Sequence, residues 1–473
     1  MLNPKEFRKT AHEFVDWMAD YLENVEEYPV KSQSQPGDIF SQLPQSAPDK
    51  PEEMSEIMKD FQEVIMPGIT HWQSPNFFAY FNANGSYPSL LAEMLTATLG
   101  TQCMIWETSP AAAELEEMMM NWLRDLTGLP SEWHGVIQDT ASTATLTALL
   151  TAREKYSEFQ VNENGFENFT DFRVYCSTET HSSVEKGVKI AGFGKANLVK
   201  IPVDEGLAMD AEALEKAIEE DLAAGKKPLC VVAALGTTGT TAFDPLEEIA
   251  QITQKHKIWL HVDAAYAGTA FVLPETRHYL KGVEHADSYV FNPHKWMFTH
   301  FDCSAYFVKD KDALLNTFSI LPEYLRTETT GKVNDYRDWG IQLGRRFRAL
   351  KLWFVMRNYG ADKIREEIKF HLDLAEGLVG KIEAAPDFEM LTPLTLNLAC
   401  FRFKPVGLED EEKVNELNAQ LVAAINKTGK IYLTHTKIRG KYTLRIVTGQ
   451  TNITQKHVDN AWELLKEMAR GMV

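Results

Sequence analysis

The sequence predicts an α/β protein whose larger part is a mostly parallel sheet covered by helices. Between about residues 88 and 310, seven short apolar runs alternate with segments of helical periodicity. The runs are apolar at nearly every position, which is typical of parallel strands that helices bury on both faces. An amphipathic segment precedes this region and a shorter mixture of strands and helices follows it. We therefore expect three parts.

The N-terminal part, residues 1–85, is expected to be a helical arm. In NPKEFRKTAHEFVDWMADYLENV, Asn3 can cap a helix and Pro4 suits its first turn. Apolar residues then recur at steps of three or four, which predicts a helix with one apolar face. A proline-rich stretch at 29–51 and a second amphipathic helix near 52–66 follow. Such an arm needs a surface to cover, so we expect it to pack on a partner subunit.

The large domain, residues 86–370, carries the predicted sheet. Helical patterns such as AEALEKAIEEDLAAG separate its strands, and crossover helices of this kind connect parallel strands. The predicted strands are GVIQ, FRVYCST, LVKIPV, LCVVAALG, IWLHVDAA, DSYVFNP and CSAYFVK.

The C-terminal part, residues 371–473, is expected to be a smaller α+β domain. A long helical stretch at about 340–383 leads into it, and helices are predicted near 411–426 and 454–469. The runs FEML, LACFRFK, IYLTHT and YTLRIV are predicted strands among these helices. Strands and helices mixed in this way are typical of the α+β class.

The charge of the chain argues against two classes of partner. It has 48 Lys and Arg against 67 Asp and Glu, a net charge of −19, whereas nucleic acid and anionic membranes require clustered positive charge. Its apolar runs are far shorter than the ~18 residues of a membrane span, and the start, MLNPKEFRKT, lacks a signal core. Five cysteines stand singly without a C-x-x-C pair, which fits a reducing compartment. We expect a cytoplasmic protein that binds neither nucleic acid nor membrane.

Polar residues at the ends of predicted strands are the candidate ligand-binding groups, because open parallel sheets bind ligands beyond the carboxyl ends of their strands. In GVIQDTASTATL, Ala141 and Ser142 begin a helix whose backbone N–H groups could bind phosphate. The alternative there is ordinary N-capping. His181 and Thr238 follow two further strands, where a single histidine is more often a cap or a core residue than a catalyst.

Two other strand ends carry ionisable groups. Asp263 ends an otherwise apolar strand, where an unpaired carboxylate is costly, so a salt bridge to an arginine would be its simplest role. The next strand end delivers Asn292, His294 and Lys295 to the same edge of the sheet. Lys295 stands among aromatic side chains in FNPHKWMF, and burial in such surroundings favours the neutral amine.

Together these groups meet the chemical needs of pyridoxal 5'-phosphate (PLP). A lysine with a lowered pKa forms a Schiff base with an aldehyde, a carboxylate holds the proton of a pyridine nitrogen, and a helix N-terminus binds phosphate. A dinucleotide site is less suitable, because Gly192 and Gly194 lack the third glycine of that fingerprint. A metal site at His261 and Asp263 lacks a third ligand nearby, so no metal is expected.

Long motifs along nearly the whole chain match one family. They are EFRKTAHEFVDWMADYLENVEEYPV, IMPGITHWQSPNFFAYF, SPAAAELE, THSSVEKG, LGTTGTTAFD, WLHVDAAYAG, FNPHKWMFTHFDCS and LGRRFRALKLWFV. With them the chain resembles the group II PLP-dependent amino-acid decarboxylases, most of all the aromatic-L-amino-acid decarboxylases of DOPA, tyrosine and tryptophan. The resemblance implies the PLP-dependent transferase fold type I. It also implies a homodimer in which N-terminal arms wrap the other subunit and the active sites lie at the dimer interface.

The resemblance implies a role for each candidate residue. Lys295 would carry PLP covalently, Asp263 would pair with its pyridine nitrogen, and His181 would stack on its ring. Tyr324, in SILPEYLRTETTG, would lie on a mobile loop and protonate the carbanion left when CO₂ departs. The remaining cofactor-binding positions are Ala141, Ser142, Asn292 and His294 around the phosphate, Ala265 against the ring, and Thr238 near His181.

The implied substrate is an aromatic L-amino acid. Gly344, in LGRRFR, would leave room for large rings such as indole, and Arg445 matches an arginine near the family's active-site region. The chain departs from animal DOPA decarboxylases at FFAYFNA, where Asn82 and Ala83 replace a proline and a threonine that contacts the substrate ring. The residues expected to form the substrate pocket are Trp72, Tyr80, Phe81, Met104 and Gly344.

The reaction implied is loss of CO₂ to give the arylalkylamine, catalysed by a carboxy-lyase. The nearest alternative is an aromatic aldehyde synthase, which decarboxylates and then oxidatively deaminates its substrate with O₂. Such relatives tend to have lost the loop tyrosine or the stacking histidine, whereas this chain has Tyr324 and His181. A decarboxylase of a non-aromatic amino acid is a further alternative. The last alternative is a relative that has the fold but no catalytic activity. The presence of Lys295 and Asp263 argues against this alternative.

Overall fold

The computed structural model describes residues 2–167, 169–320 and 332–472, and it divides into two compact units. The large unit is Ala83–Leu372, and the discontinuous unit combines Met1–Asn82 with Asp373–Val473. The expected arm and the expected small domain thus fall in one unit. Backbone hydrogen bonds join them, from Val30 N–H to Gly429 O (2.8 Å) and from Phe78 N–H to Tyr432 O (3.0 Å).

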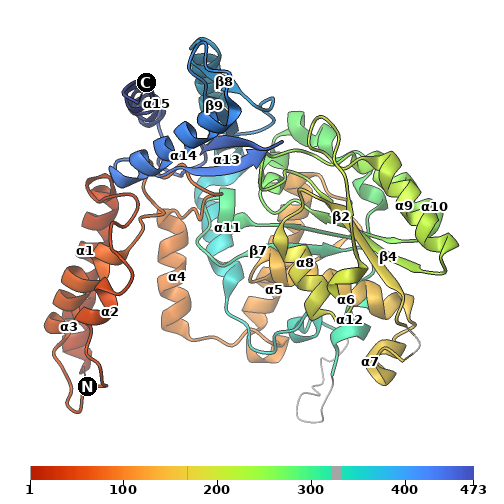
Figure 1. The fold of residues 1–473 in the computed structure, drawn as a ribbon. Coiled ribbons are helices and arrows are strands. Elements are labelled where there is room, and N and C mark those ends of the chain that lie inside the picture. The colour runs from red at the N-terminus through yellow and green to blue at the C-terminus, as the bar shows by residue number, and fades with distance from the viewer. Residues whose placement is uncertain (1, 168, 321–331, 473) are drawn as a thin grey trace. The chain divides into compact units, whose positions relative to one another are not determined.

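The large unit contains the predicted seven-stranded, mostly parallel sheet, with strand order β1-β7-β6-β5-β4-β2-β3 (Figure 1). Only β7 runs antiparallel to its neighbours, β1 and β6. Every residue of β5 is buried, as expected of an apolar strand covered on both faces. The strands are β1 (His134–Gln138), β2 (Phe172–Ser177), β3 (Leu198–Ile201), β4 (Lys227–Ala234), β5 (Trp259–Asp263), β6 (Ser288–Phe291) and β7 (Ser304–Val308).

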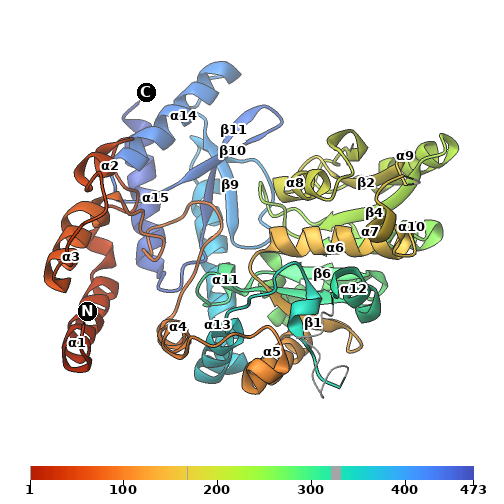
Figure 2. The same ribbon diagram turned by 90° about the horizontal axis from the view of Figure 1, so that it is seen from below.

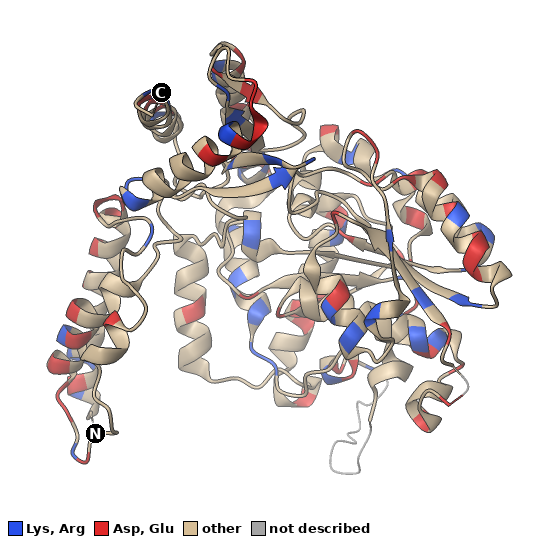
Figure 3. Ribbon diagram, viewed as in Figure 1, with Lys and Arg blue, Asp and Glu red and all other residues tan. Residues whose placement is uncertain are grey.

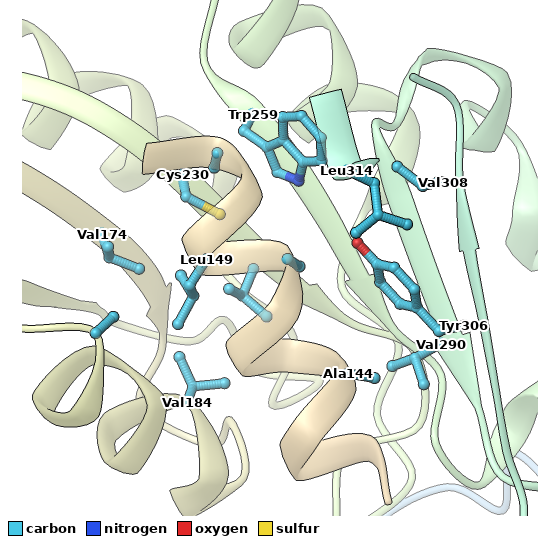
Figure 4. Close-up of a cluster of buried hydrophobic side chains, with 14 of the residues drawn as sticks. Ala144, Leu149, Val174, Val184, Cys230, Trp259, Val290, Tyr306, Val308 and Leu314 are labelled. Carbon is cyan, nitrogen blue, oxygen red and sulfur yellow. The ribbon is translucent and has the colours of Figure 1, made fainter. Parts of the chain in front are cut away.

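Helices cover this sheet, and α6 lies on it between α8 and α12 (Figure 2). Ala144 of α6, Val184 of α8 and Leu314 of α12 join strand residues in one apolar core (Figure 4). The helices of this unit are α4 (Tyr87–Leu99), α5 (Pro110–Thr127), α6 (Ala141–Tyr156), α7 (Gln160–Asn164), α8 (Ser182–Ile190), α9 (Ala211–Ala223), α10 (Leu246–His256), α11 (Pro293–Trp296) and α12 (Lys311–Phe318); α13 (Arg348–Glu383) begins here and bends at Gly360.

The discontinuous unit contains a four-stranded antiparallel sheet in the order β10-β11-β9-β8. The four predicted strand runs all contribute to it. Its strands are β8 (Phe388–Met390), β9 (Leu398–Phe403), β10 (Thr434–Ile438) and β11 (Lys441–Val447), and its C-terminal helices are α14 (Glu411–Lys427) and α15 (Gln455–Arg470).

The N-terminal segment of this unit forms α1 (Pro4–Glu23), α2 (Asp38–Gln42) and α3 (Met54–Asp60). The side chain of Asn3 caps α1 by accepting hydrogen bonds from the N–H groups of Lys5 and Glu6, as its position before Pro4 predicted. No residue of α1 is buried, although Trp17 packs edge-on against Phe61 with ring centroids 5.3 Å apart.

Charged residues of both signs are interspersed along α1 and along α9 and α10 (Figure 3). Among the described residues, no helix combines the length and hydropathy needed to cross a bilayer.

Candidate active site

The predicted site residues of the large unit lie at one edge of the seven-stranded sheet. Because β1 and β6 both pair antiparallel with β7, their carboxyl ends point the same way as those of β2, β4 and β5. The segments that follow these five strands carry the candidates. They are Ala141 and Ser142 after β1, His181 after β2, Thr238 after β4, Asp263 and Ala265 at the end of β5, and Asn292, His294 and Lys295 after β6.

Asp263 is the last residue of β5 and is held in a defined position. Its side chain is 8% exposed, and one carboxylate oxygen accepts a hydrogen bond from Ala265 N–H (3.0 Å). Its neighbours in register are Ala234 of β4 and Val290 of β6. The carbonyl oxygen of Ala265 in turn accepts from Asn292 N–H (2.9 Å), which ties the turn after β5 to the turn after β6.

Lys295 lies on the one-turn helix α11 and is partly buried. Its N–H donates to Asn292 O (2.9 Å). Burial lowers the pKa of Lys295, and the negative charge of Asp263 opposes that shift. The net effect increases the fraction of neutral amine, which is the nucleophilic form.

The aromatic residues around Lys295 fix its backbone. Trp296 is fully buried and stacks on Tyr266, with ring centroids 4.9 Å apart and ring planes 1° from parallel. Its indole N–H donates to Nδ1 of His371 (2.9 Å). The aromatic residues that made Lys295 conspicuous in the sequence therefore anchor the turn that presents its amine.

His181 caps the N-terminus of α8, and the residue as a whole is exposed. Its Nδ1 accepts from Ser183 N–H (3.2 Å) and lies 2.8 Å from the Ser183 hydroxyl oxygen. A proton on the neutral ring therefore belongs on Nε2. Partial desolvation lowers the pKa of His181, with Asp263 opposing and Lys295 reinforcing the shift. The charges of His181, Asp263 and Lys295 thus influence one another, as expected of groups at one site.

Hydrogen-bond donors are present at the strand ends where phosphate binding was predicted. His294 is buried, and its Nδ1 accepts from Cys303 N–H (2.9 Å), which leaves Nε2–H as a donor. Burial, with Lys295 and Lys351 adding to it, lowers the pKa of His294 to about 3, so the ring is neutral. Thr140 caps α6 by accepting from Thr143 N–H, and Ser142 is exposed at the start of that helix.

Ser304 is a supporting residue that the sequence did not reveal. It pairs with Gln138 across β1 and β7, and its hydroxyl donates to the Oδ1 atom of Asn292. Both side chains are buried. With Oδ1 accepting this hydrogen bond, the N–H₂ group of Asn292 is the part of the amide that can donate to another group. Only the cross-strand register brings residue 304 to residue 292, so local sequence carries no signal for it.

Thr238 lies in the turn after β4 and is exposed. The Thr237 and Thr240 hydroxyl oxygens, 3.2 Å apart, close this turn. Ala265, beside Asp263, is partly buried.

The predicted pocket residues fall in two groups, one in each unit. In the discontinuous unit, Trp72 and Tyr80 stack with ring centroids 5.8 Å apart. The Tyr80 hydroxyl lies 3.3 Å from that of Tyr432, which sequence inspection missed. The Arg445 guanidinium lies over the ring of Phe81, 5.6 Å from the centroid of that ring. Arg445 also donates a hydrogen bond to the Thr434 hydroxyl (3.0 Å).

In the large unit, Met104 and Gly344 belong to adjacent segments, because Cys103 N–H donates to Arg345 O (3.0 Å). A Cβ atom on Gly344 would lie 3.3 Å from Nε2 of Gln102. A side chain at position 344 would therefore narrow the space between these two segments. Tyr324 lies outside the described residues, and its role stays a prediction.

The donor set fits PLP. Neutral His294, the amide of Asn292 and the start of α6 offer donors to a phosphate dianion, a buried carboxylate suits a protonated pyridine nitrogen, and Lys295 has a lowered pKa.

Comparison with known proteins agrees with this chemistry. Among curated relatives, phenylacetaldehyde synthase of Petunia hybrida is 42% identical over all of this chain and 96% of its own length. Tyrosine decarboxylase 4 of Petroselinum crispum is 42% identical over all of this chain and 95% of its own length. Tryptophan decarboxylase TDC1 of Camptotheca acuminata is 42% identical over 99% of this chain and 94% of its own length.

Solved structures are similar over the full length. Tryptophan decarboxylase of Catharanthus roseus in complex with L-tryptophan has a TM-score of 0.94 at 38% identity, and TDC of Oryza sativa with PLP and tryptamine has 0.97 at 35%. Both comparisons cover 100% of this chain and 99% of the other. The family model described as the pyridoxal-dependent decarboxylase conserved domain matches residues 36–404. With the fold, the site and these matches in agreement, the chain belongs to the pyridoxal-dependent decarboxylase family.

Proposed function

We propose that this carboxy-lyase releases CO₂ from an aromatic L-amino acid and leaves the arylalkylamine, with PLP held on Lys295. The observation that carries the proposal is the arrangement of Lys295, Asp263 and His181 at one sheet edge, where their charges influence one another. When bound, PLP supplies a ring that accepts the electrons of the broken bond between Cα and the carboxylate.

Lys295 and Asp263 would serve different groups of the cofactor. The Lys295 amine, whose pKa burial lowers, would hold the cofactor covalently through its aldehyde group. Asp263, fixed by Ala265 N–H, keeps the proton on the pyridine nitrogen by offering it a buried negative charge.

The remaining residues position the cofactor. Asn292 and His294 would donate to phosphate oxygens, together with Ser142 and the N–H groups that begin at Ala141. His181 would cover one face of the cofactor ring and exclude water from it, and its Nε2–H would be a donor for the substrate carboxylate. Thr238 supports the His181 region, and Ala265 is small enough for the ring to lie against it.

A proton must reach Cα after CO₂ has left, and we propose Tyr324 as its donor. A phenol poised over Cα would protonate it before O₂ could react there, and so select the amine product. For the substrate ring we propose the aromatic residues Trp72, Tyr80 and Phe81, with Met104 and Gly344.

We further propose a homodimer. Tyr87, Leu91, Leu95 and Leu99 recur every four residues on α4 and are all exposed, which forms an apolar stripe along one helix face. On α1, Phe7 and Val15 are exposed as well. A second copy of the chain is the occupant that the resemblance implies for these surfaces. A cytoplasmic location stays a prediction from the single, unpaired cysteines.

An aromatic aldehyde synthase is the second candidate, because relatives of that activity from Petunia hybrida and Rosa hybrid cultivar are 42% identical, as two tyrosine decarboxylases are. The deciding experiment incubates holoenzyme with L-tyrosine, L-phenylalanine, L-tryptophan and L-DOPA and measures CO₂, amine, aldehyde, ammonia and peroxide. Amine equal to CO₂ supports the proposal. Aldehyde with stoichiometric ammonia and peroxide would replace it with the synthase, and no CO₂ from any aromatic substrate would refute both.

A further inference from the structure

The imidazole ring of His294 is held by the short segment at residues 301–303. Both backbone groups of Cys303 bond to His294, because Cys303 N–H donates to Nδ1 (2.9 Å) and Cys303 O accepts from His294 N–H (3.3 Å). The ring of Phe301 packs on the His294 ring, with centroids 4.6 Å apart. An Nδ1 atom that accepts a hydrogen bond cannot carry the proton of a neutral ring, so the position of Cys303 places that proton on Nε2.

Asp302, the middle residue of this segment, is fixed by an arginine from a distant part of the chain. Arg348 is the first residue of α13, and it donates from Nε to Oδ1 (3.1 Å) and from Nη2 to Oδ2 (2.9 Å) of Asp302. The Arg348 side chain is 8% exposed and that of Asp302 is 18% exposed, so solvent screens this ion pair only weakly. Two parallel hydrogen bonds fix the orientation of a carboxylate as well as its position.

The charge of Asp302 does not decide the charge of His294. Burial lowers the pKa of His294 to about 3, with Lys295 and Lys351 adding to the shift and Asp302 opposing it. The ring is therefore neutral at pH 7 and carries one proton. Residue 302 can still decide which ring nitrogen carries that proton, because it sets the position of the Cys303 N–H that follows it.

We propose that Asp302 and Arg348 are positioning residues that keep the proton of His294 on Nε2, where it can be donated to the cofactor phosphate. With the proton on Nδ1, the ring would offer an unprotonated nitrogen to phosphate oxygens, which accept hydrogen bonds and would gain no donor from it. This inference rests on the proposed function in one step, the assignment of His294 to the phosphate.

The test removes both charges together, in Asp302→Leu with Arg348→Met, because a single change would leave the other charge buried and unpaired. The matched control is Arg173→Met with Asp221→Leu. That ion pair lies in the same unit, with both side chains 18% exposed, but Arg173 is near the start of β2, at the end of the strand opposite the site.

Two measurements follow on each protein. Nitrogen-15 NMR of histidine-labelled apoprotein at pH 7, with His294→Gln to assign the signals, reports which ring nitrogen carries the proton. Wild type and control should show the proton of His294 on Nε2 alone, and the double variant should show a mixture of the two forms. Equilibrium dialysis should give a PLP affinity about 10-fold weaker in the double variant, as expected for the loss of one hydrogen bond to a charged group, and unchanged in the control.

The outcomes separate this inference from the proposed function. A proton on Nδ1 in wild type, or on Nε2 alone in the folded double variant, would overturn the inference. Unchanged PLP affinity in a variant with mixed forms would overturn it too. Weaker PLP binding without CO₂ release from any aromatic substrate would uphold it and refute the proposed function. If the double variant does not fold, Asp302→Asn keeps the size of the side chain without its charge and should show both changes to a smaller extent.

Discussion

Replacing Ser304 with alanine removes the hydroxyl that orients Asn292 and tests whether Asn292 serves the cofactor. The Ser304 hydroxyl is fully buried and donates to Oδ1 of Asn292. Loss of such a bond leaves a buried acceptor unpaired, which costs about 1–3 kcal/mol of unfolding free energy. The freed amide can also turn its oxygen toward phosphate, so we expect PLP to bind roughly 5- to 10-fold more weakly, equivalent to about 1 kcal/mol.

The assay measures PLP affinity by equilibrium dialysis of apoprotein and stability by urea unfolding. Ser157→Ala is the matched control, because the Ser157 hydroxyl is buried and bonded to Glu154 O (3.2 Å). Ser157 follows the C-terminus of α6, about 24 Å from the helix start at 1.5 Å per residue. Both variants should lose stability, and only Ser304→Ala should lose PLP affinity. Unchanged affinity in Ser304→Ala would show that the orientation of Asn292 is unimportant for the cofactor.

Three further predictions follow from the site. Lys295→Ala should abolish CO₂ release and the visible absorbance of bound PLP, and retained turnover would refute its covalent role. Tyr324→Phe should shift the product from amine toward aldehyde with ammonia and peroxide, and an unchanged product ratio would remove Tyr324 from the protonation step. The third concerns pH. The folded-state pKa of His294, about 3, lies below the ordinary value of 6.5, so the unfolded chain takes up the proton first as pH falls. Wild-type stability should therefore decline from about pH 6.5 toward pH 3, and His294→Gln should decline less steeply in urea unfolding at pH 7, 6 and 5. Equal slopes would contradict a neutral buried His294.

Much of the large unit could be predicted because buried parallel strands are apolar at almost every position. All seven predicted strands occur, and the edge they share carries the predicted groups from Asp263 to Lys295. The ends of the predicted strands were sufficient to predict which groups share this edge. The carboxyl ends of parallel strands lie at one edge of a sheet, whatever the order of the strands in it.

Features that depend on long-range pairing could not be predicted. Ser304 reaches Asn292 through the register of β1, β7 and β6, and Tyr432 reaches Tyr80 through contacts between segments about 350 residues apart. Local periodicity contains no information on either. The grouping of the N-terminal arm with the C-terminal domain also depends on contacts between distant segments, such as the hydrogen bond from Val30 N–H to Gly429 O.

The most direct test of the central claim is to locate the cofactor's covalent link. Holoenzyme is reduced with borohydride, digested, and its peptides are analysed by mass spectrometry. We predict a phosphopyridoxyl group on Lys295 alone, and loss of that label in Lys295→Ala. A label on another lysine, or no label on a protein that shows the absorbance of bound PLP, would contradict it.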